Sequence, residues 1–222
     1  MKRPIALILL LVAGCSAGSA AGVSSPSQPV PSVSASGGAA STPPSAPASA
    51  TTQPPSGASQ AAVPAEKNPP GDIPDNVAFV TYRNAVGRYS FTHPEGWSET
   101  TRAGTATFTD KLNGVQVQTT PAAAQPTVDS AKRVDVPDLS GSQAAFELRG
   151  VSAVTVPGGK GVRVVYRRNS APDQVTGRQY RDEVERYELV SNGHQVVMEL
   201  FGPVGADNVD AYRTMVQSLR LP

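Results

Sequence analysis

The two histidines are the first candidates for chemistry, because imidazole acts as a general base or a metal ligand near neutral pH. His93 lies in the segment YSFTHPEGWS, residues 89–98, and His194 follows an Asn-Gly pair. A metal site normally needs three or four converging His, Cys or carboxylate groups. The Pro and Gly of His93-Pro94-Glu95-Gly96 instead predict a turn that returns Trp97 to the core. A hydrolase that uses His93 or His194 is our third-ranked hypothesis.

Arginines form the second candidate group. Guanidinium groups on neighbouring strands can bind a carboxylate, a phosphate or an anionic polymer through paired hydrogen bonds. We take Arg163, Arg167 and Arg186 as a candidate face for an anion or a partner. The alternative is a solvated outer sheet face on which opposite charges pair and discourage edge aggregation. Both interpretations rest on one stretch that contains basic and acidic residues: Arg163, Arg167, Arg168, Arg178, Arg181, Asp182, Glu183, Glu185, Arg186 and Glu188.

Motifs of known enzymes are missing from the sequence. No Gly-x-Ser-x-Gly elbow occurs, so the serines lack the strained turn that activates a hydroxyl. The glycine-rich segment 157–161 lacks the spacing and the following Ser or Thr of a phosphate loop. We therefore expect a non-enzymatic protein with no cofactor.

Cys15 is the one cysteine of the chain, so no disulfide within the chain is possible. Residues 1–14 are typical of an export signal, with Lys2 and Arg3 before an apolar run. That run is too short to cross a bilayer, which takes roughly 20 apolar residues. The segment Val12-Ala13-Gly14-Cys15 resembles the bacterial lipobox, which implies cleavage before Cys15 and acylation of its sulfur. Two or more acyl chains hold a protein stably on a membrane.

Residues 15–78 are predicted to be a disordered linker that begins at the lipidated cysteine. The segment is mostly Ser, Ala, Pro, Gly, Thr, Gln and Val, and has no aromatic residue. Such a composition cannot bury enough apolar area to offset the entropy of ordering the backbone. Glycosylation of its Ser and Thr residues is left open.

Residues 79–222 carry most of the charges and all the aromatic side chains, which predicts one domain. The whole chain has 19 basic and 18 acidic residues. This balance lacks the basic excess typical of nucleic-acid-binding proteins, so we expect no nucleic-acid partner.

Alternating apolar residues predict three antiparallel hairpins in this domain. The clearest joins 185–191 to 194–201 through Asn192-Gly193, a typical two-residue turn. Its expected register places Leu189 opposite Val196, Tyr187 opposite Met198, and Arg186 opposite Glu199. The other hairpins join 151–156 to 162–168 and 105–110 to 115–119.

Two helices are predicted. Residues 207–218 have apolar side chains at helical spacing, with acidic residues first and basic residues last, as the helix dipole favours. A second helix is expected from about Ser140 to Arg149, capped by Asp138 or Ser140 and ended by Gly150. Helices that cover an antiparallel sheet make an α+β fold.

The order of these elements resembles the PsbP-like family, particularly its bacterial LpqN-type lipoprotein branch. The resemblance rests on Tyr89-x-Phe91, Pro94-x-Gly96-Trp97, a following glycine turn and strand, a long hairpin and a final helix ending in Ser218-Leu219. It covers residues 79–222 and implies an α/β/α sandwich with a central antiparallel sheet. Plant members are non-catalytic partners of photosystem II, but the long linker departs from them, so the photosynthetic role is not carried over.

Three functional hypotheses follow. The first is a lipoprotein at the extracytoplasmic face of the cell membrane, anchored in the bilayer by acylated Cys15. Its domain would be a binding or accessory module for a protein partner or an envelope component. The second is a carrier of a small amphiphile held between sheet and helix, in an apolar cavity with few polar groups. The third is the hydrolase that uses His93 or His194.

Overall fold

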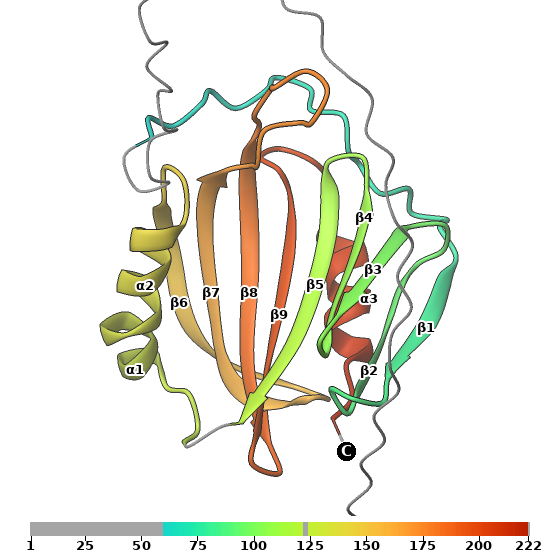
Figure 1. The fold of residues 1–222 in the computed structure, drawn as a ribbon, viewed down its shortest axis with the longest axis vertical. Coiled ribbons are helices and arrows are strands. Elements are labelled where there is room, and N and C mark those ends of the chain that lie inside the picture. Colours follow the sequence, from blue (N-terminus) through green and yellow to red (C-terminus); the bar gives the residue numbers. More distant parts are fainter. Residues whose placement is uncertain (1–59, 122–123, 222) are drawn as a thin grey trace, which may run out of the picture. The chain divides into compact units, whose positions relative to one another are not determined.

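The computed structural model describes residues 60–121 and 124–221. Its core is a seven-stranded antiparallel sheet in the order β3-β4-β5-β9-β8-β7-β6, beside a two-stranded sheet of β1 and β2 (Figure 1). The strands are β1 (Phe79–Asn84), β2 (Tyr89–Pro94), β3 (Ser98–Arg102), β4 (Thr105–Asp110), β5 (Asn113–Pro121), β6 (Glu147–Val156), β7 (Gly159–Asn169), β8 (Arg181–Ser191) and β9 (His194–Pro203). The helices are α1 (Val128–Arg133), α2 (Asp135–Ser142) and α3 (Val209–Ser218).

The three predicted hairpins are present. In β8–β9, Leu189 pairs with Val196 and Arg186 with Glu199, which confirms the expected register. The turn contains Asn192 and Gly193 with φ of 50° and 77°, the positive values that a tight two-residue turn needs. The hairpins β4–β5 and β6–β7 also form; β4 has the predicted bounds, and β5, β6 and β7 are longer than predicted.

Each face of the large sheet packs against helices, which confirms the predicted α+β fold. The first face carries α3 and most of the core, including Phe108, Leu189 and Met198. The second face buries Val164 and Tyr166 of β7 against α1 and α2. Period-two alternation along the strands sends neighbouring side chains to opposite faces and so builds both cores.

The predicted helix over residues 140–149 is wrong. α2 ends at Ser142, Ala145 has a φ of 52°, and β6 begins at Glu147. Pairing with β7 continues the ladder through this segment, with Glu147 opposite Arg167. Cross-strand hydrogen bonds to β7 therefore replace the helix that local spacing favours.

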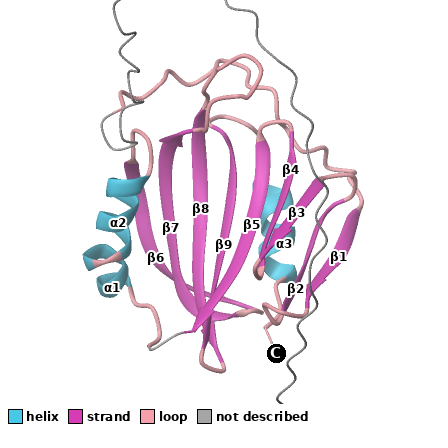
Figure 2. Ribbon diagram, in the orientation of Figure 1, coloured by secondary structure: helices cyan, strands magenta, loops and turns pink. Residues whose placement is uncertain are grey.

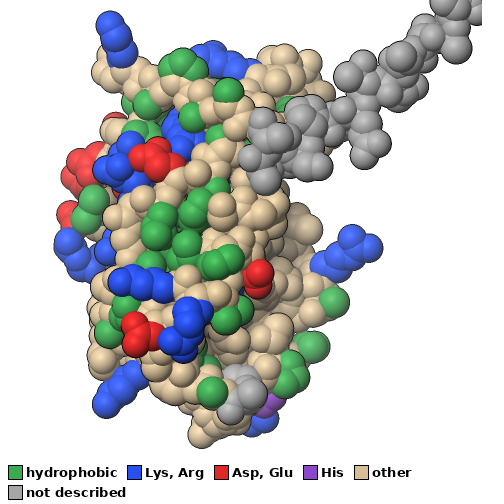
Figure 3. All heavy atoms as spheres, turned by 90° about the vertical axis from the view of Figure 1, so that its left-hand side faces the viewer, with side chains coloured by type: hydrophobic (Ala, Val, Ile, Leu, Met, Phe, Trp, Pro, Cys, Tyr) green, Lys and Arg blue, Asp and Glu red, His purple; other side chains and the backbone are tan. Residues whose placement is uncertain are grey.

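The helices α1 and α2 lie on one side of the molecule, where hydrophobic side chains gather with charged ones around them (Figure 3). α1 begins at a capping box in which Thr127 accepts a hydrogen bond from Ser130 N and Ser130 Oγ accepts one from Thr127 N. Val134, between the two helices, and Leu148 of β6 are exposed large hydrophobic residues.

Tyr89 and Phe91 lie outside the large sheet. They lie in β2, which pairs with β1 alone among the described strands, and both side chains are buried in the core against α3. His93 and Pro94 belong to the same strand, so the turn is confined to Glu95 and Gly96. Trp97 is buried, as predicted.

Residues 60–78, expected to be linker, lie against the domain instead. This segment, called the strap below, crosses from the β6–β7 end of the sheet to β1 as a loop without helix or strand (Figures 1 and 2). Val63 N donates to Asn169 Oδ1 at 3.0 Å, and Asn169 Nδ2 donates to Ala61 O at 2.8 Å. Further along, Ile73 is 6% exposed and belongs to the core. These contacts satisfy backbone groups of a segment that lacks secondary structure.

Candidate functional site

The predicted arginine face is divided between the two sides of the sheet. Arg163 and Arg167 of β7 point to the face that carries α3, because Val162, Val164 and Tyr166 occupy the other face. Arg186 of β8 is paired with Val164 and lies on the opposite face. The three guanidinium groups therefore do not converge on one ligand.

Each of these arginines already has a carboxylate partner. Arg163 makes a two-point contact with Glu185, with Nε–Oε2 at 3.0 Å and Nη2–Oε1 at 2.5 Å. Arg167 Nε donates to Glu183 Oε2 at 3.0 Å. This pairing is the arrangement expected of the solvated-face alternative.

Arg186 is the centre of a buried polar network. Its Nε donates to Glu188 Oε1 at 2.6 Å and its Nη1 to Glu199 Oε1 at 2.7 Å. The Glu188 side chain is 1% exposed. Burial and the nearby Glu188 raise the pKa of Asp135 in α2. Two buried carboxylates thus share one guanidinium, which makes Arg186 a structural counter-charge.

A second buried pair lies near the other end of β7 and β8. Arg168 Nε is 3.7 Å from Asp182 Oδ2, and the Asp182 side chain is 5% exposed. Burial raises the pKa of Asp182 to about 7, although Arg168 and Arg181 oppose this shift. The long distance and the burial explain why desolvation outweighs the ion pair.

His93 has the surroundings of a core residue. It is 8% exposed and its ring stacks on Phe108 with centroids 3.8 Å apart. Its Nδ1 donates to Pro94 O at 2.9 Å. Burial lowers the pKa of His93. Among the described residues, no hydroxyl or carboxylate is hydrogen-bonded to His93, so the geometry lacks a nucleophile for it to activate.

His194 lies elsewhere, at the exposed start of β9. It lines a small cavity together with Arg88 and Leu221. Within residues 60–121 and 124–221, no three His, Cys, Asp or Glu side chains are grouped so that they could hold a metal ion. Cys15 lies outside the described residues.

The space between the sheet and α3 is filled by side chains. Met215 of α3, Leu219 directly after it, and Leu189 and Met198 of the sheet are fully buried and belong to one cluster. An amphiphile held between sheet and helix, as the carrier hypothesis requires, would have to displace these side chains.

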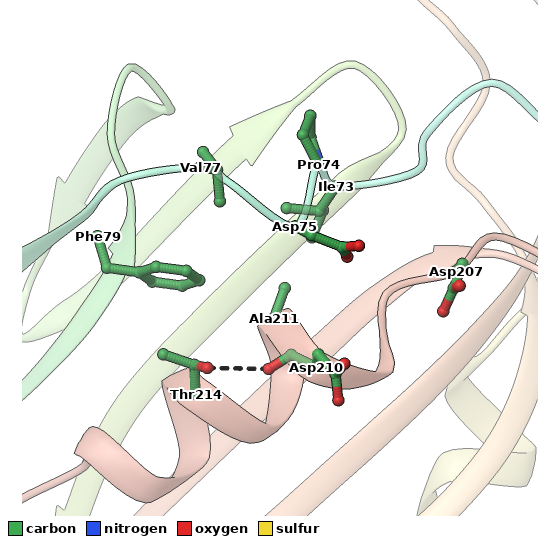
Figure 4. Close-up of a pocket in the computed structure, with 9 residues that line it drawn as sticks. All are labelled: Ile73, Pro74, Asp75, Val77, Phe79, Asp207, Asp210, Ala211 and Thr214. Atoms are coloured by element: carbon green, nitrogen blue, oxygen red, sulfur yellow. Dashed lines mark hydrogen bonds between the residues drawn. The ribbon is translucent and has the colours of Figure 1, made fainter.

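A cavity of about 280 Å³ opens instead between the strap and α3 (Figure 4). Apolar groups line part of it, with the Phe79 ring and Val77 on one side and Ala211 of α3 on the other. Three carboxylates, those of Asp75, Asp207 and Asp210, accompany the apolar groups. The residues that line it are Ile73, Pro74, Asp75, Val77, Phe79, Asp207, Asp210, Ala211 and Thr214.

Asn208 holds the two walls of this cavity together. It occupies the N-cap position of α3, where Asn usually bonds the first turn of its own helix, but it makes no such bond. Its Oδ1 instead accepts a hydrogen bond from Ile73 N at 2.9 Å. Asp207 N donates to Asp72 Oδ1 at 2.9 Å beside it. The strap, which carries Asp75, is therefore fixed to the start of α3, which carries Asp210.

Sequence reasoning missed this cavity because half of it comes from the assumed linker. The sequence held one local indication that this segment contacts the domain. Ile73 and Val77 are aliphatic and Asp72 and Asp75 are charged, whereas the residues upstream are mostly Ser, Ala and Pro. Contact with α3 could not be inferred from that pattern alone.

No family model matches the chain, and no curated protein matches it in sequence. Solved structures of similar fold include PsbP (CyanoP) from Synechocystis sp. PCC 6803, with 17% identity, a TM-score of 0.47, and coverage of 68% of this chain and 98% of that one. LpqN of Mycobacterium tuberculosis, involved in cell envelope biogenesis, has 11% identity and a TM-score of 0.42, with coverage of 67% and 93%. The Ran-binding protein Mog1p of Saccharomyces cerevisiae has 10% identity and a TM-score of 0.44, with coverage of 66% and 96%.

Both proteins that the sequence resemblance names, PsbP and LpqN, are thus among the structurally similar ones. At these identities and TM-scores the similarity describes the course of the chain and says nothing of activity or partners.

Proposed function

We propose that this protein is a lipoprotein on the extracytoplasmic face of the cell membrane, held there by acylated Cys15. Its domain acts as a non-enzymatic binding or accessory module for a protein partner of the envelope. The leader pattern of residues 1–15 supports the anchor. No helix among the described residues is long and apolar enough to cross a membrane.

The cavity between the strap and α3 is the observation that carries the binding role. Its apolar walls suit the aliphatic stem of a Lys or Arg side chain, and Asp75, Asp207 and Asp210 suit the cationic head. Asp210 already pairs with Arg213 at 2.6 Å on the exposed surface of α3. Asp75 and Asp207 have no ion-pair partner among the described residues, so they supply the free negative charge. We assign the cavity to a basic side chain of the partner.

The strap is the last part of the segment predicted to be the linker. Its residues Ile73, Pro74, Asp75 and Val77 form one wall of the cavity. A bound partner would therefore contact the segment through which the anchor holds the domain.

Site-specific crosslinking in intact cells tests the binding role. A photoreactive amino acid replaces Thr214, which lines the cavity and is exposed on α3. We expect one dominant crosslinked protein, whose yield falls at least fivefold in Asp75→Asn/Asp207→Asn. The matched control Asp110→Asn/Asp129→Asn removes the same charge from exposed positions of β4 and α1 and should leave the yield unchanged. An equal yield in both double variants would refute the assignment of the cavity.

The anchor has a separate test. Cys15→Ala should abolish incorporation of labelled fatty acid and release the chain from the membrane fraction, while Cys15 in the parent chain carries the label. Tight membrane attachment of Cys15→Ala would contradict the anchor without bearing on the cavity.

A further inference from the structure

A different pocket is lined by three arginines that have no carboxylate partner among the described residues. It has a volume of about 550 Å³ and lies where the β1–β2 turn meets the end of the chain after α3. Arg83, Arg88 and Arg220 line it, and no Asp or Glu is among its lining residues. In the part of the chain that the structure describes, none of these three arginines forms a salt bridge. They differ in this from Arg163, Arg167 and Arg186.

Backbone pairing fixes the positions of two of these arginines, Arg83 and Arg220. Arg83 belongs to β1 and pairs with Ser90 of β2. On its other side, Ser90 exchanges two hydrogen bonds with Arg220: Ser90 N donates to Arg220 O at 3.0 Å, and Arg220 N donates to Ser90 O at 2.8 Å. Ser90 is thus the common neighbour that fixes Arg83 and Arg220 on either side of one strand.

Arg88 occupies an unfavourable backbone conformation in the turn before β2. Its φ is 55°, in the left-handed region that residues other than Gly, Asn and Asp rarely adopt. Asn84 Oδ1 stabilises the turn by accepting a hydrogen bond from Gly87 N at 2.7 Å. Residues held in such conformations cluster at ligand sites.

The guanidinium of Arg220 is also ordered. Its Nη1 donates to Gln217 O at 2.7 Å and to Leu219 O at 2.9 Å, at the C-terminal end of α3. One nitrogen thus makes both bonds, and donors on the other two nitrogens remain for a ligand.

Within the described residues no carboxylate pairs with these three positive charges, so they repel one another and favour an anion among them. A phosphate group fits this arrangement better than a carboxylate. It carries about −1.5 to −2 charges and three acceptor oxygens, which several guanidinium groups can share. Ala85, Tyr89 and Leu221 also line the pocket, so an apolar portion of the ligand can lie beside the phosphate.

We propose that the pocket lined by Arg83, Arg88 and Arg220 binds a phosphate group, carried either by an amphiphile such as a phospholipid or by a soluble phosphate compound. This site is separate from the acidic cavity, and it does not depend on the anchor at Cys15.

Titration calorimetry of the full-length chain in a neutral detergent tests the proposal. The probes are inorganic phosphate and dihexanoyl phosphatidic acid. We expect binding of at least one probe, with Kd raised tenfold or more in Arg83→Gln/Arg88→Asn. Asn is chosen at position 88 because it tolerates a positive φ.

The control Lys132→Gln/Arg133→Gln removes two positive charges from the last turn of α1. It should change Kd by less than twofold, and thermal unfolding should show that both double variants are folded. Phosphatidic acid binding tenfold more tightly than phosphate identifies an amphiphile, and equal affinities identify a soluble compound; either result supports the site. No binding of either probe, or an equal loss in both double variants, overturns it.

Discussion

Asn208 Nδ2 donates a hydrogen bond to Asn113 Oδ1 at 2.9 Å, although the two residues are 95 positions apart in the chain. Both are buried, with 5% and 3% of their surface exposed. Each also holds the strap: Asn113 Nδ2 donates to Gly71 O, and Asn208 Oδ1 accepts from Ile73 N. A pair of side-chain amides therefore takes the place of strand pairing for this segment.

Asn208→Ala should release the strap. Ile73 N and Asn113 Oδ1 would lose their partner, and an unsatisfied buried polar group costs about 1–3 kcal/mol. We expect a lower free energy of unfolding in urea and faster hydrogen exchange at Ile73. Val209→Ala, which changes the neighbouring side chain with 62% of its surface exposed, is the control. Unchanged exchange at Ile73 would show that Asn208 does not hold the strap.

Arg186→Ala should destabilise the fold far more than Arg163→Ala. Removing Arg186 leaves the buried Glu188 and Glu199 without a counter-charge, which costs about 3–5 kcal/mol. Removing Arg163 breaks a partly exposed pair with Glu185 and should cost about 1 kcal/mol. Equilibrium denaturation of both variants checks this, and equal losses would mean that the Arg186 network is not the buried counter-charge described above.

Gly161→Ala should disrupt the pairing of β7 with β8. A Cβ at this position would lie 1.8 Å from Glu188 O, a backbone atom that cannot move without breaking the ladder. We expect a loss above about 2 kcal/mol and a lower thermal midpoint. Gly150→Ala is the matched control, since a Cβ there meets nothing within 4 Å. Similar thermal midpoints for the two variants would contradict the close approach at Gly161.

The pH dependence of stability should show the raised pKa of Asp182. Because its pKa in the fold is about 7 and thus above the unfolded value, Asp182 contributes stability that is present below about pH 4. This contribution is lost as the pH rises through about 7. The difference in unfolding free energy between the parent chain and Asp182→Asn should therefore decline from pH 4 to pH 8, by on the order of a few kcal/mol.

Asp173 provides a contrast for that experiment. Hydrogen bonds from Thr176 lower the pKa of Asp173, so its contribution is present at higher pH and is lost as the pH falls. Asp173→Asn should consequently change the pH profile in the opposite direction. The same direction in both variants would contradict the burial of Asp182.

The local sequence was sufficient to predict strand pairing where one short turn fixes the register of the two strands. Asn192-Gly193 permits positive φ at two successive positions, so the β8–β9 register and the pairing of Arg186 with Glu199 followed from the sequence alone. The alternation in β7 can likewise be read from the sequence, with Arg163 and Arg167 at odd positions on one face and Val162 and Val164 at even positions on the other. The helix α3 was predicted from its spacing to within two residues at its start and at the correct end.

The tertiary structure decided everything that depends on distant pairing. The segment 170–180 between β7 and β8 contains no single turn motif that fixes register, so the sequence did not tell that Arg186 and Arg163 lie on opposite faces of the sheet. Residues 147–149 join β6 because a hydrogen-bonded partner strand outweighs weak helical spacing. The strap is ordered by Asn113, Asn169 and Asn208, whose side chains reach it from far along the chain. The strap forms no helix or strand of its own, so contacts with those distant residues decide its path.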